Sequence, residues 1–162
     1  MELATQVGAL LKAHGLLLVT AESCTGGGVA QAITEIAGSS EWFERGFVTY
    51  ANLAKVEMLD VPPATLQAHG AVSETTVRAM VAGALAHSPA QVALAVSGIA
   101  GPGGGSIEKP VGTVWFAWGL REGEVIAQRH LLTGDRAEVR EKAVSIALQG
   151  VEDLLKSLTV TA

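Results

Sequence analysis

A short apolar run that leads into three consecutive glycines constrains this chain more than any other feature. Leu16–Val19 predicts a buried strand, and the apolar spacing that follows predicts a helix over about 25–37. Residues 21–28, between the two, are Ala-Glu-Ser-Cys-Thr-Gly-Gly-Gly. A glycine inside a helix costs about 1 kcal/mol relative to alanine, so three at a helix start indicate close approach to the backbone. Bare N–H groups there stabilise anions, including an oxyanion. The alternative is a tight loop that needs glycine only for its geometry.

Composition and charge limit the class of protein. The 162 residues predict a single domain, 1–162, with a substantial core. Acidic residues outnumber basic ones, 16 to 11, and no Lys/Arg cluster occurs, which argues against a nucleic-acid partner. The apolar runs are too short to span a membrane, and no secretion signal is expected at the N-terminus. One cysteine fits a reducing compartment, so we expect a cytoplasmic protein.

Hydrophobic periodicity and capping residues predict alternating helices and strands. Helices are expected over about 2–14, 25–37, 53–59 (capped by Asn52) and 63–68, and after Ser73 and the Asp135/Glu138 pair. Strands are expected over about 15–20, 46–50, 91–96, 111–119 and 123–131. The last connections are too short for parallel crossovers, so at least one strand pair is antiparallel. The predicted fold is α/β, a three-layer α/β/α sandwich with a mixed sheet of about five strands.

A second glycine-rich loop, 97–106, also follows an apolar strand. If its strand is the parallel neighbour of the first, both loops open onto the same cleft at the carboxyl ends of the strands. Neither loop matches a dinucleotide or P-loop pattern. The alternative for 97–106 is a long connector whose glycines and proline supply turns.

Three further residues are candidates for the site. Lys55 falls in the first turn of its predicted helix, where the helix dipole disfavours a cation and burial would lower the amine's pKa. The alternative is an ordinary solvated lysine. Tyr50 could orient Lys55 or contact a ligand, or be a half-buried strand residue. Glu22 either fixes the glycine turn or lies on the surface. The four histidines and one cysteine lack metal-ligand spacing, so we expect no metal.

Taken together, these segments resemble the nicotinamide-nucleotide amidohydrolase family, the domain type found at the C-terminus of the competence/damage-inducible protein CinA, here in stand-alone form. The stretches that carry the resemblance are AESCTGG at 21–27, Gly38-Ser39-Ser40, WFERGFVTYAN at 42–52, Lys55, HGAVSE at 69–74, SGIAGPGGG at 97–105 and KPVGTVWFA at 109–117. They cover nearly the whole chain in order. Ala51 departs from the family pattern, where serine is common.

The resemblance implies hydrolysis of the carboxamide of nicotinamide mononucleotide to nicotinate mononucleotide and ammonia, without a cofactor. It implies Ser23 as nucleophile and Lys55 as base, with Tyr50 lining the site. Amides near Thr25, Gly26 and Gly27 would hold the oxyanion. Residues expected to contact the nucleotide are Gly98, Ile99, Ala100 and Gly101, with Lys109, Arg136 and Arg140 as candidates for its phosphate.

Three alternatives stay open. Cys24 could be the nucleophile, since a helix N-terminus lowers a thiol pKa. The chain could be a non-catalytic module that binds a nucleotide or a partner in DNA uptake or repair. It could also act on a different small amide. A homo-oligomer is expected from the large side chains Trp42, Phe43, Trp115 and Trp118, which exceed what one small sheet face needs.

Overall fold

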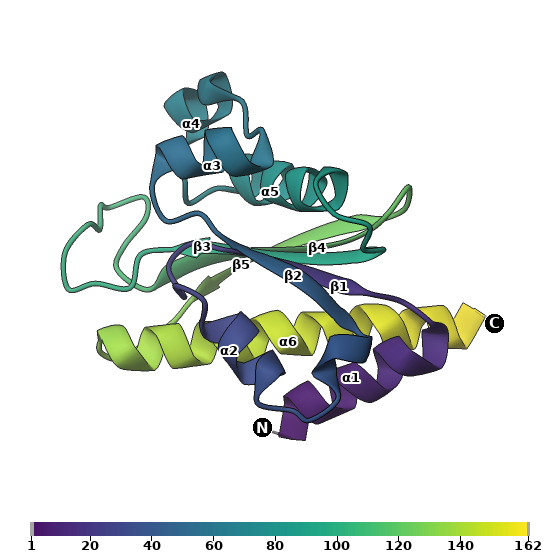
Figure 1. The fold of residues 1–162 in the computed structure, drawn as a ribbon. Coiled ribbons are helices and arrows are strands. Elements are labelled where there is room, and N and C mark those ends of the chain that lie inside the picture. The colour runs from purple at the N-terminus through teal and green to yellow at the C-terminus, as the bar shows by residue number, and fades with distance from the viewer. Residues whose placement is uncertain (1, 162) are drawn as a thin grey trace.

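A computed structural model describes residues 2–161 of the chain. Helices and strands alternate in the first part of the chain, and then three helices, three strands and a long last helix follow (Figure 1). The helices are α1 (Glu2–His14), α2 (Gly28–Thr34), α3 (Asn52–Leu59), α4 (Pro63–His69), α5 (Glu74–Ala86) and α6 (Arg136–Thr161), with a 3-10 turn at Ser39–Glu41. The strands are β1 (Leu18–Glu22), β2 (Phe43–Val48), β3 (Val92–Gly98), β4 (Thr113–Leu120) and β5 (Val125–Leu131).

The strands form one mixed sheet in the order β2-β1-β3-β4-β5. β1 lies between β2 and β3 and is parallel to both, whereas β4 and β5 are added by antiparallel pairing. The carboxyl ends of β1, β2 and β3 therefore share one edge of the sheet. The two glycine-rich loops leave the sheet at this edge, as predicted.

Helices cover both faces of the sheet (Figure 1). On one face α1, α2 and α6 pack on a core that includes Leu18, Val96 and Phe116. On the other face α5 packs on Val19 and Ala95, with α3 and α4 beyond it. Side chains alternate between the two cores along each central strand, because successive strand residues point to opposite faces. The three-layer α/β/α sandwich predicted from the sequence is confirmed.

Several predicted boundaries were wrong by a few residues. β1 begins at Leu18 and continues to Glu22, so the motif at 21–27 starts inside the strand. β2 ends at Val48, two residues earlier than expected. Asn52 is the first residue of α3, and the N-cap is Ala51, which makes no side-chain cap. The helix thus begins without the predicted asparagine cap.

The other two predicted caps are confirmed. Ser73 Oγ accepts a hydrogen bond from the N–H of Thr76 at the start of α5. Before α6, Asp135 and Glu138 exchange side-chain and backbone hydrogen bonds of 2.9 and 3.0 Å. Each pair satisfies N–H groups that a helix start leaves without partners.

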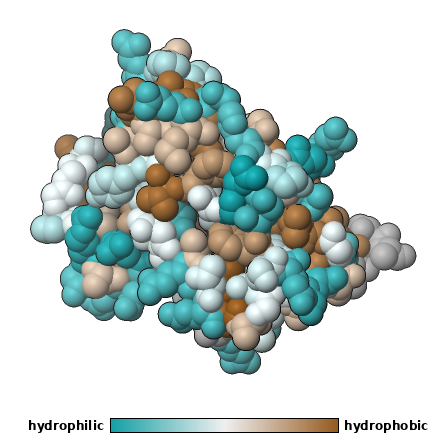
Figure 2. All heavy atoms as spheres, in the orientation of Figure 1, coloured by the Kyte–Doolittle hydropathy of each residue, from teal (hydrophilic) through white to brown (hydrophobic). Residues whose placement is uncertain are grey.

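The large aromatic side chains are used mainly inside the chain. Trp42 and Trp118 are each 2% exposed, and Trp118 donates its indole N–H to the carbonyl of Ala147 on α6. On the face shown in Figure 2, hydrophobic residues lie in small groups among hydrophilic ones. The tryptophan count therefore does not by itself indicate an exposed apolar face. Among the described residues, no helix combines the length and apolarity needed to cross a membrane.

The close approach of α3 and α5 generates a stability prediction. A Cβ built on Gly83 would lie 1.9 Å from the backbone carbonyl oxygen of Leu59. In an exposed helix alanine is more stabilising than glycine by about 1 kcal/mol. At Gly83 the clash of the added Cβ with the Leu59 backbone outweighs that gain. We expect Gly83→Ala to lower the free energy of unfolding by about 1–3 kcal/mol in denaturant titration.

Gly103→Ala is the matched control, because a Cβ at that position meets no heavy atom within 4 Å. Its free energy of unfolding should stay within about 0.5 kcal/mol of the parent value. A Gly83→Ala protein as stable as the parent would contradict the tight contact between the two helices.

Candidate active site

The two glycine-rich loops meet because β1 and β3 are parallel and in register. Glu22 pairs with Val96, and the N–H of Ser23 donates to the carbonyl of Val96 at 3.0 Å. A cavity of about 260 Å³ opens beside Ser23. Its lining comes from both loops, from α3 and α6, and from the segments before α3 and α5. The lining residues are Ser23, Cys24, Tyr50, Lys55, Ala71, Val72, Ser97, Gly98, Ala100 and Arg136.

Lys55 reaches this cavity from α3 and is completely buried. Its Nζ lies 3.0 Å from Oγ of Ser23. The amine also donates to the backbone carbonyls of Thr49 and Tyr50, at 2.8 and 3.1 Å. The segment between β2 and α3 therefore supplies both the lysine and the two carbonyls that hold it. These carbonyls have no signature in the sequence.

The Nζ atom of Lys55 has three hydrogen-bond partners, which match the three donors of an ammonium, and the same three partners can also serve a neutral amine. A neutral amine has two N–H donors and one lone pair, and the two carbonyls take the two donors. The lone pair is then left for the Ser23 hydroxyl, whose other acceptor, the Tyr50 carbonyl, is farther away at 3.4 Å. Burial lowers the pKa of Lys55 from 10.5 to about 8. Lys55 is thus placed to accept the proton of Ser23 at mildly alkaline pH.

Glu22 fixes the turn that carries Ser23, which settles the question its position in the sequence left open. Its carboxylate is completely buried and accepts hydrogen bonds from Thr25 Oγ1 and from the N–H groups of Val29 and Ala30. The N-cap of α2 is Gly27, which has a left-handed backbone conformation and no side chain that could cap the helix. Glu22 replaces that cap from the end of β1, and its negative charge suits a helix N-terminus. The sequence signal for this role was an acidic residue at the end of an apolar strand, followed by a helix start that has no capping residue of its own.

Cys24 also lines the cavity, but its environment opposes a thiolate. Burial raises the pKa of the Cys24 thiol from 9.0 to about 11, against the lowering effect of neighbouring backbone N–H groups and Arg140. The alternative in which the helix start activates this thiol is disfavoured, because desolvation raises its pKa more than the helix start lowers it. Ser23 Oγ, in contrast, lies 3.0 Å from Lys55 Nζ.

The other predicted residues divide into two groups. Tyr50, Arg136, Gly98 and Ala100 line the cavity, and Arg136 donates to the phenol oxygen of Tyr50 at 3.2 Å. Tyr50 itself is 62% exposed, so its ring lies at the mouth. Residues predicted for the site but not among those lining this cavity are Thr25, Gly26, Gly27, Ile99, Gly101, Lys109 and Arg140.

Three of that second group are engaged elsewhere. The N–H of Gly26 donates to the carbonyl of Ser23 at 3.0 Å and closes the turn. Lys109 Nζ donates to the carbonyl of His69 at 2.6 Å. Arg140 donates to the backbone of the Ser23 turn from the α6 side, a contact that the sequence did not predict. Within the described residues, no three His, Cys, Asp or Glu side chains are grouped closely enough to hold a metal ion.

These features define an α/β protein with a buried serine–lysine pair at the carboxyl edge of parallel strands. Residues 1–155 match the family described as the CinA C-terminal domain. The chain belongs to this family, as the resemblance indicated.

Relatives and solved structures agree with this assignment. The chain is 58% identical over 149 residues to the nicotinamide-nucleotide amidohydrolase PncC of Escherichia coli strain K12, covering 92% of this chain and 90% of the relative. It is 52% identical to the protein of the same name from Pseudomonas putida, covering 94% of each chain. The crystal structure of the competence/damage inducible protein CihA from Agrobacterium tumefaciens is similar with a TM-score of 0.92, at 49% identity over 96% of this chain and 94% of that one.

The buried thiol generates a prediction that the single cysteine makes easy to measure. With a pKa of about 11, almost none of the Cys24 thiol is ionised at pH 7.5, and the thiolate is the reactive form. We expect native protein to react with iodoacetamide at least about tenfold more slowly than denaturant-unfolded protein at that pH. Intact-mass spectrometry would follow the reaction. Equal rates in the two states would contradict the assigned environment of Cys24.

Proposed function

We propose that this protein hydrolyses the carboxamide of nicotinamide mononucleotide to nicotinate mononucleotide and ammonia. The observation that carries the proposal is the 3.0 Å separation of Lys55 Nζ and Ser23 Oγ inside a small cavity. The names of the PncC relatives, nicotinamide-nucleotide amidohydrolases of 52–58% identity, support the choice of substrate. A serine hydroxyl needs a nearby base to become a nucleophile, and an adjacent neutral amine meets that need.

In the first step Ser23 Oγ attacks the carboxamide carbon while its proton passes to Lys55. The lysine, now cationic, keeps its hydrogen bonds to the Thr49 and Tyr50 carbonyls. When the tetrahedral intermediate collapses, the C–N bond breaks and Lys55 gives its proton to the departing nitrogen, which leaves as ammonia. Water then attacks the Ser23 ester, again with Lys55 as base, and releases the carboxylate and the free serine.

The oxyanion of the tetrahedral intermediate needs hydrogen-bond donors from the Ser23 turn. Gly26 is excluded because its N–H already donates to the carbonyl of Ser23. The N–H groups of Thr25 and Gly27 both make no hydrogen bond within the described residues, and we assign the role to Thr25, which is nearer to Ser23 in the turn. One such donor typically contributes about 3–4 kcal/mol of transition-state stabilisation.

The phosphate of the nucleotide needs a cation near the cavity mouth. Arg136 lines the cavity, and it lies in the first turn of α6, where the helix dipole also favours an anion. It donates to the Gly101 carbonyl and the Tyr50 phenol, so it is held between the second glycine-rich loop and the segment that joins β2 to α3. We assign the phosphate to Arg136 ahead of Lys109.

A single domain over 1–162, a homo-oligomer and a cytoplasmic location stay predictions.

Single substitutions of the serine and the lysine test the proposal. Ser23→Ala removes the nucleophile and should lower kcat for ammonia release from nicotinamide mononucleotide by about 10⁴-fold or more. Lys55→Met removes the base at similar side-chain length and should lower kcat by about 10²–10⁴-fold. Coupled ammonia detection and chromatographic measurement of nicotinate mononucleotide give both products.

Ser40→Ala and Lys12→Met are matched controls, because both residues are exposed and lie outside the cavity. Both variants should keep the parent kcat, and circular dichroism should show all four variants folded. If Ser23→Ala kept full activity and Cys24→Ala lost it, the nucleophile would be the Cys24 thiol and not Ser23. A parent protein that releases no ammonia from this nucleotide would reject the proposed substrate.

A further inference from the structure

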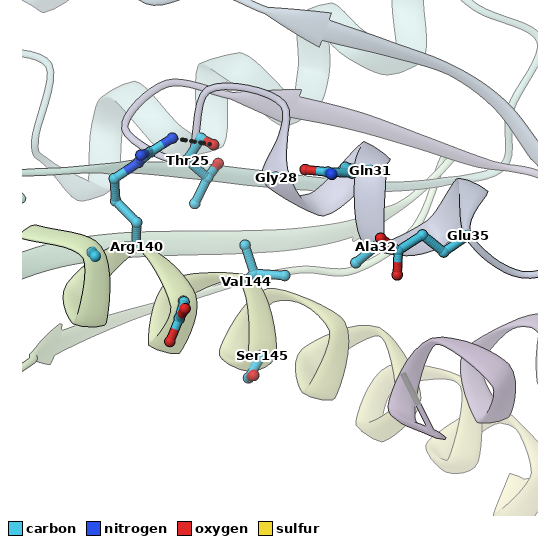
Figure 3. Close-up of a pocket in the computed structure, with 10 residues that line it drawn as sticks. Thr25, Gly28, Gln31, Ala32, Glu35, Arg140, Val144 and Ser145 are labelled. Atoms are coloured by element: carbon cyan, nitrogen blue, oxygen red, sulfur yellow. Dashed lines mark hydrogen bonds between the residues drawn. The ribbon is translucent and has the colours of Figure 1, made fainter.

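Arg140 contacts the backbone of the Ser23 turn but is not among the residues that line the catalytic cavity. It lies on α6, one helical turn after Arg136, and extends toward Thr25 (Figure 3). Its Nε donates to the carbonyl of Cys24 at 3.1 Å, and its Nη2 lies 3.3 Å from the carbonyl of Thr25. Arg140 and Thr25 both border a separate groove of about 540 Å³ between α2 and α6, whose lining includes neither Ser23 nor Lys55.

These two carbonyls belong to the peptides that carry the N–H groups of Thr25 and Gly26. In a trans peptide the C=O and N–H bonds point in opposite directions. Because Arg140 binds the Cys24 carbonyl, the Thr25 N–H of the same peptide points away from Arg140. The cation also draws electron density toward the carbonyl oxygen, which makes the Thr25 N–H a stronger donor, since linked hydrogen bonds polarise one another.

The turn is held from its other side by Glu22. The Glu22 carboxylate accepts from Thr25 Oγ1 at 2.6 Å and from two N–H groups of α2. Thr25 is thus fixed by its side chain toward a buried anion and by its carbonyl toward an exposed cation. The side chain and the carbonyl of Thr25 are therefore both hydrogen-bonded, whereas its backbone N–H has no partner among the described residues.

We propose that Arg140 is a positioning residue for the reaction, which orients and polarises the Thr25 N–H toward the oxyanion through hydrogen bonds to the Cys24 and Thr25 carbonyls. This inference rests on the proposed amidohydrolase function. It replaces the phosphate-binding role that the sequence suggested for Arg140. A residue acting in this way changes the stability of the transition state and leaves binding of the ground-state nucleotide nearly unchanged.

Separate measurements of rate and affinity test this role. We expect Arg140→Met to lower kcat for nicotinamide mononucleotide by about 10- to 100-fold, less than complete loss of an oxyanion donor. Arg140→Lys, which keeps the charge but not the two-pronged contact, should lie between Arg140→Met and the parent. In a Ser23→Ala background, which prevents turnover, Arg140→Met should change the calorimetric Kd for the nucleotide by less than about threefold.

Lys142→Met is the matched control, since it removes a positive charge from the exposed surface of the same helix and should keep the parent kcat. Arg140 is itself exposed, so Arg140→Met should keep the parent Tm within a few degrees. A Kd weakened tenfold or more with kcat preserved would overturn the inference and return Arg140 to the phosphate. An unchanged kcat would also overturn it. A parent protein inactive on the nucleotide would instead reject the proposed function itself.

Discussion

The contact on which this site depends is the one between a buried amine and a serine hydroxyl. Lys55 is completely buried, and among the described residues its hydrogen bonds go to Ser23 and to two backbone carbonyls and to no carboxylate. Because the folded-state pKa lies below the ordinary value, burial of Lys55 destabilises the fold below about pH 8, and this penalty disappears as pH rises toward 10.5. The protein thus gives up stability at neutral pH to keep an amine that loses its proton readily.

The fold provides this contact through the parallel part of its sheet. Ser23 follows β1, the Thr49 and Tyr50 carbonyls follow β2, and the second glycine-rich loop follows β3. Parallel strands bring these three segments to one edge. α3 begins immediately after β2 and is held by α5 at Gly83, so the lysine returns over the same edge from the opposite layer. Glu22, inside the sheet, fixes the turn in relation to α2.

Much of this organisation was predictable, because it depends on patterns that extend over many residues. The apolar strands, the amphipathic helices and the glycine-rich loops placed the layers and the common edge correctly. Its place in the first turn of a predicted helix made Lys55 a candidate, but the assignment of Ser23 as nucleophile and Lys55 as base came from the resemblance. What the sequence missed depends on the direction of single backbone groups. No pattern of residue types marks the carbonyls that hold Lys55, the N–H of Gly26 that bonds to Ser23, or the contact of Arg140. Asn52 was not the cap because α3 starts one residue earlier than predicted.

Titration of the Lys55 amine is the most direct test of the account. The side-chain nitrogens of ¹⁵N-lysine-labelled protein can be followed by NMR from pH 6 to 12, with Lys55→Met identifying the resonance. Lys156, whose pKa Glu152 raises through a hydrogen bond, supplies a contrasting signal in the same spectra. The account predicts that Lys55 titrates near pH 8, and that the nucleophilic serine becomes active as the pH rises through that value. A Lys55 midpoint at the ordinary 10.5 would contradict it, because the amine would then hold its proton when Ser23 has to lose one.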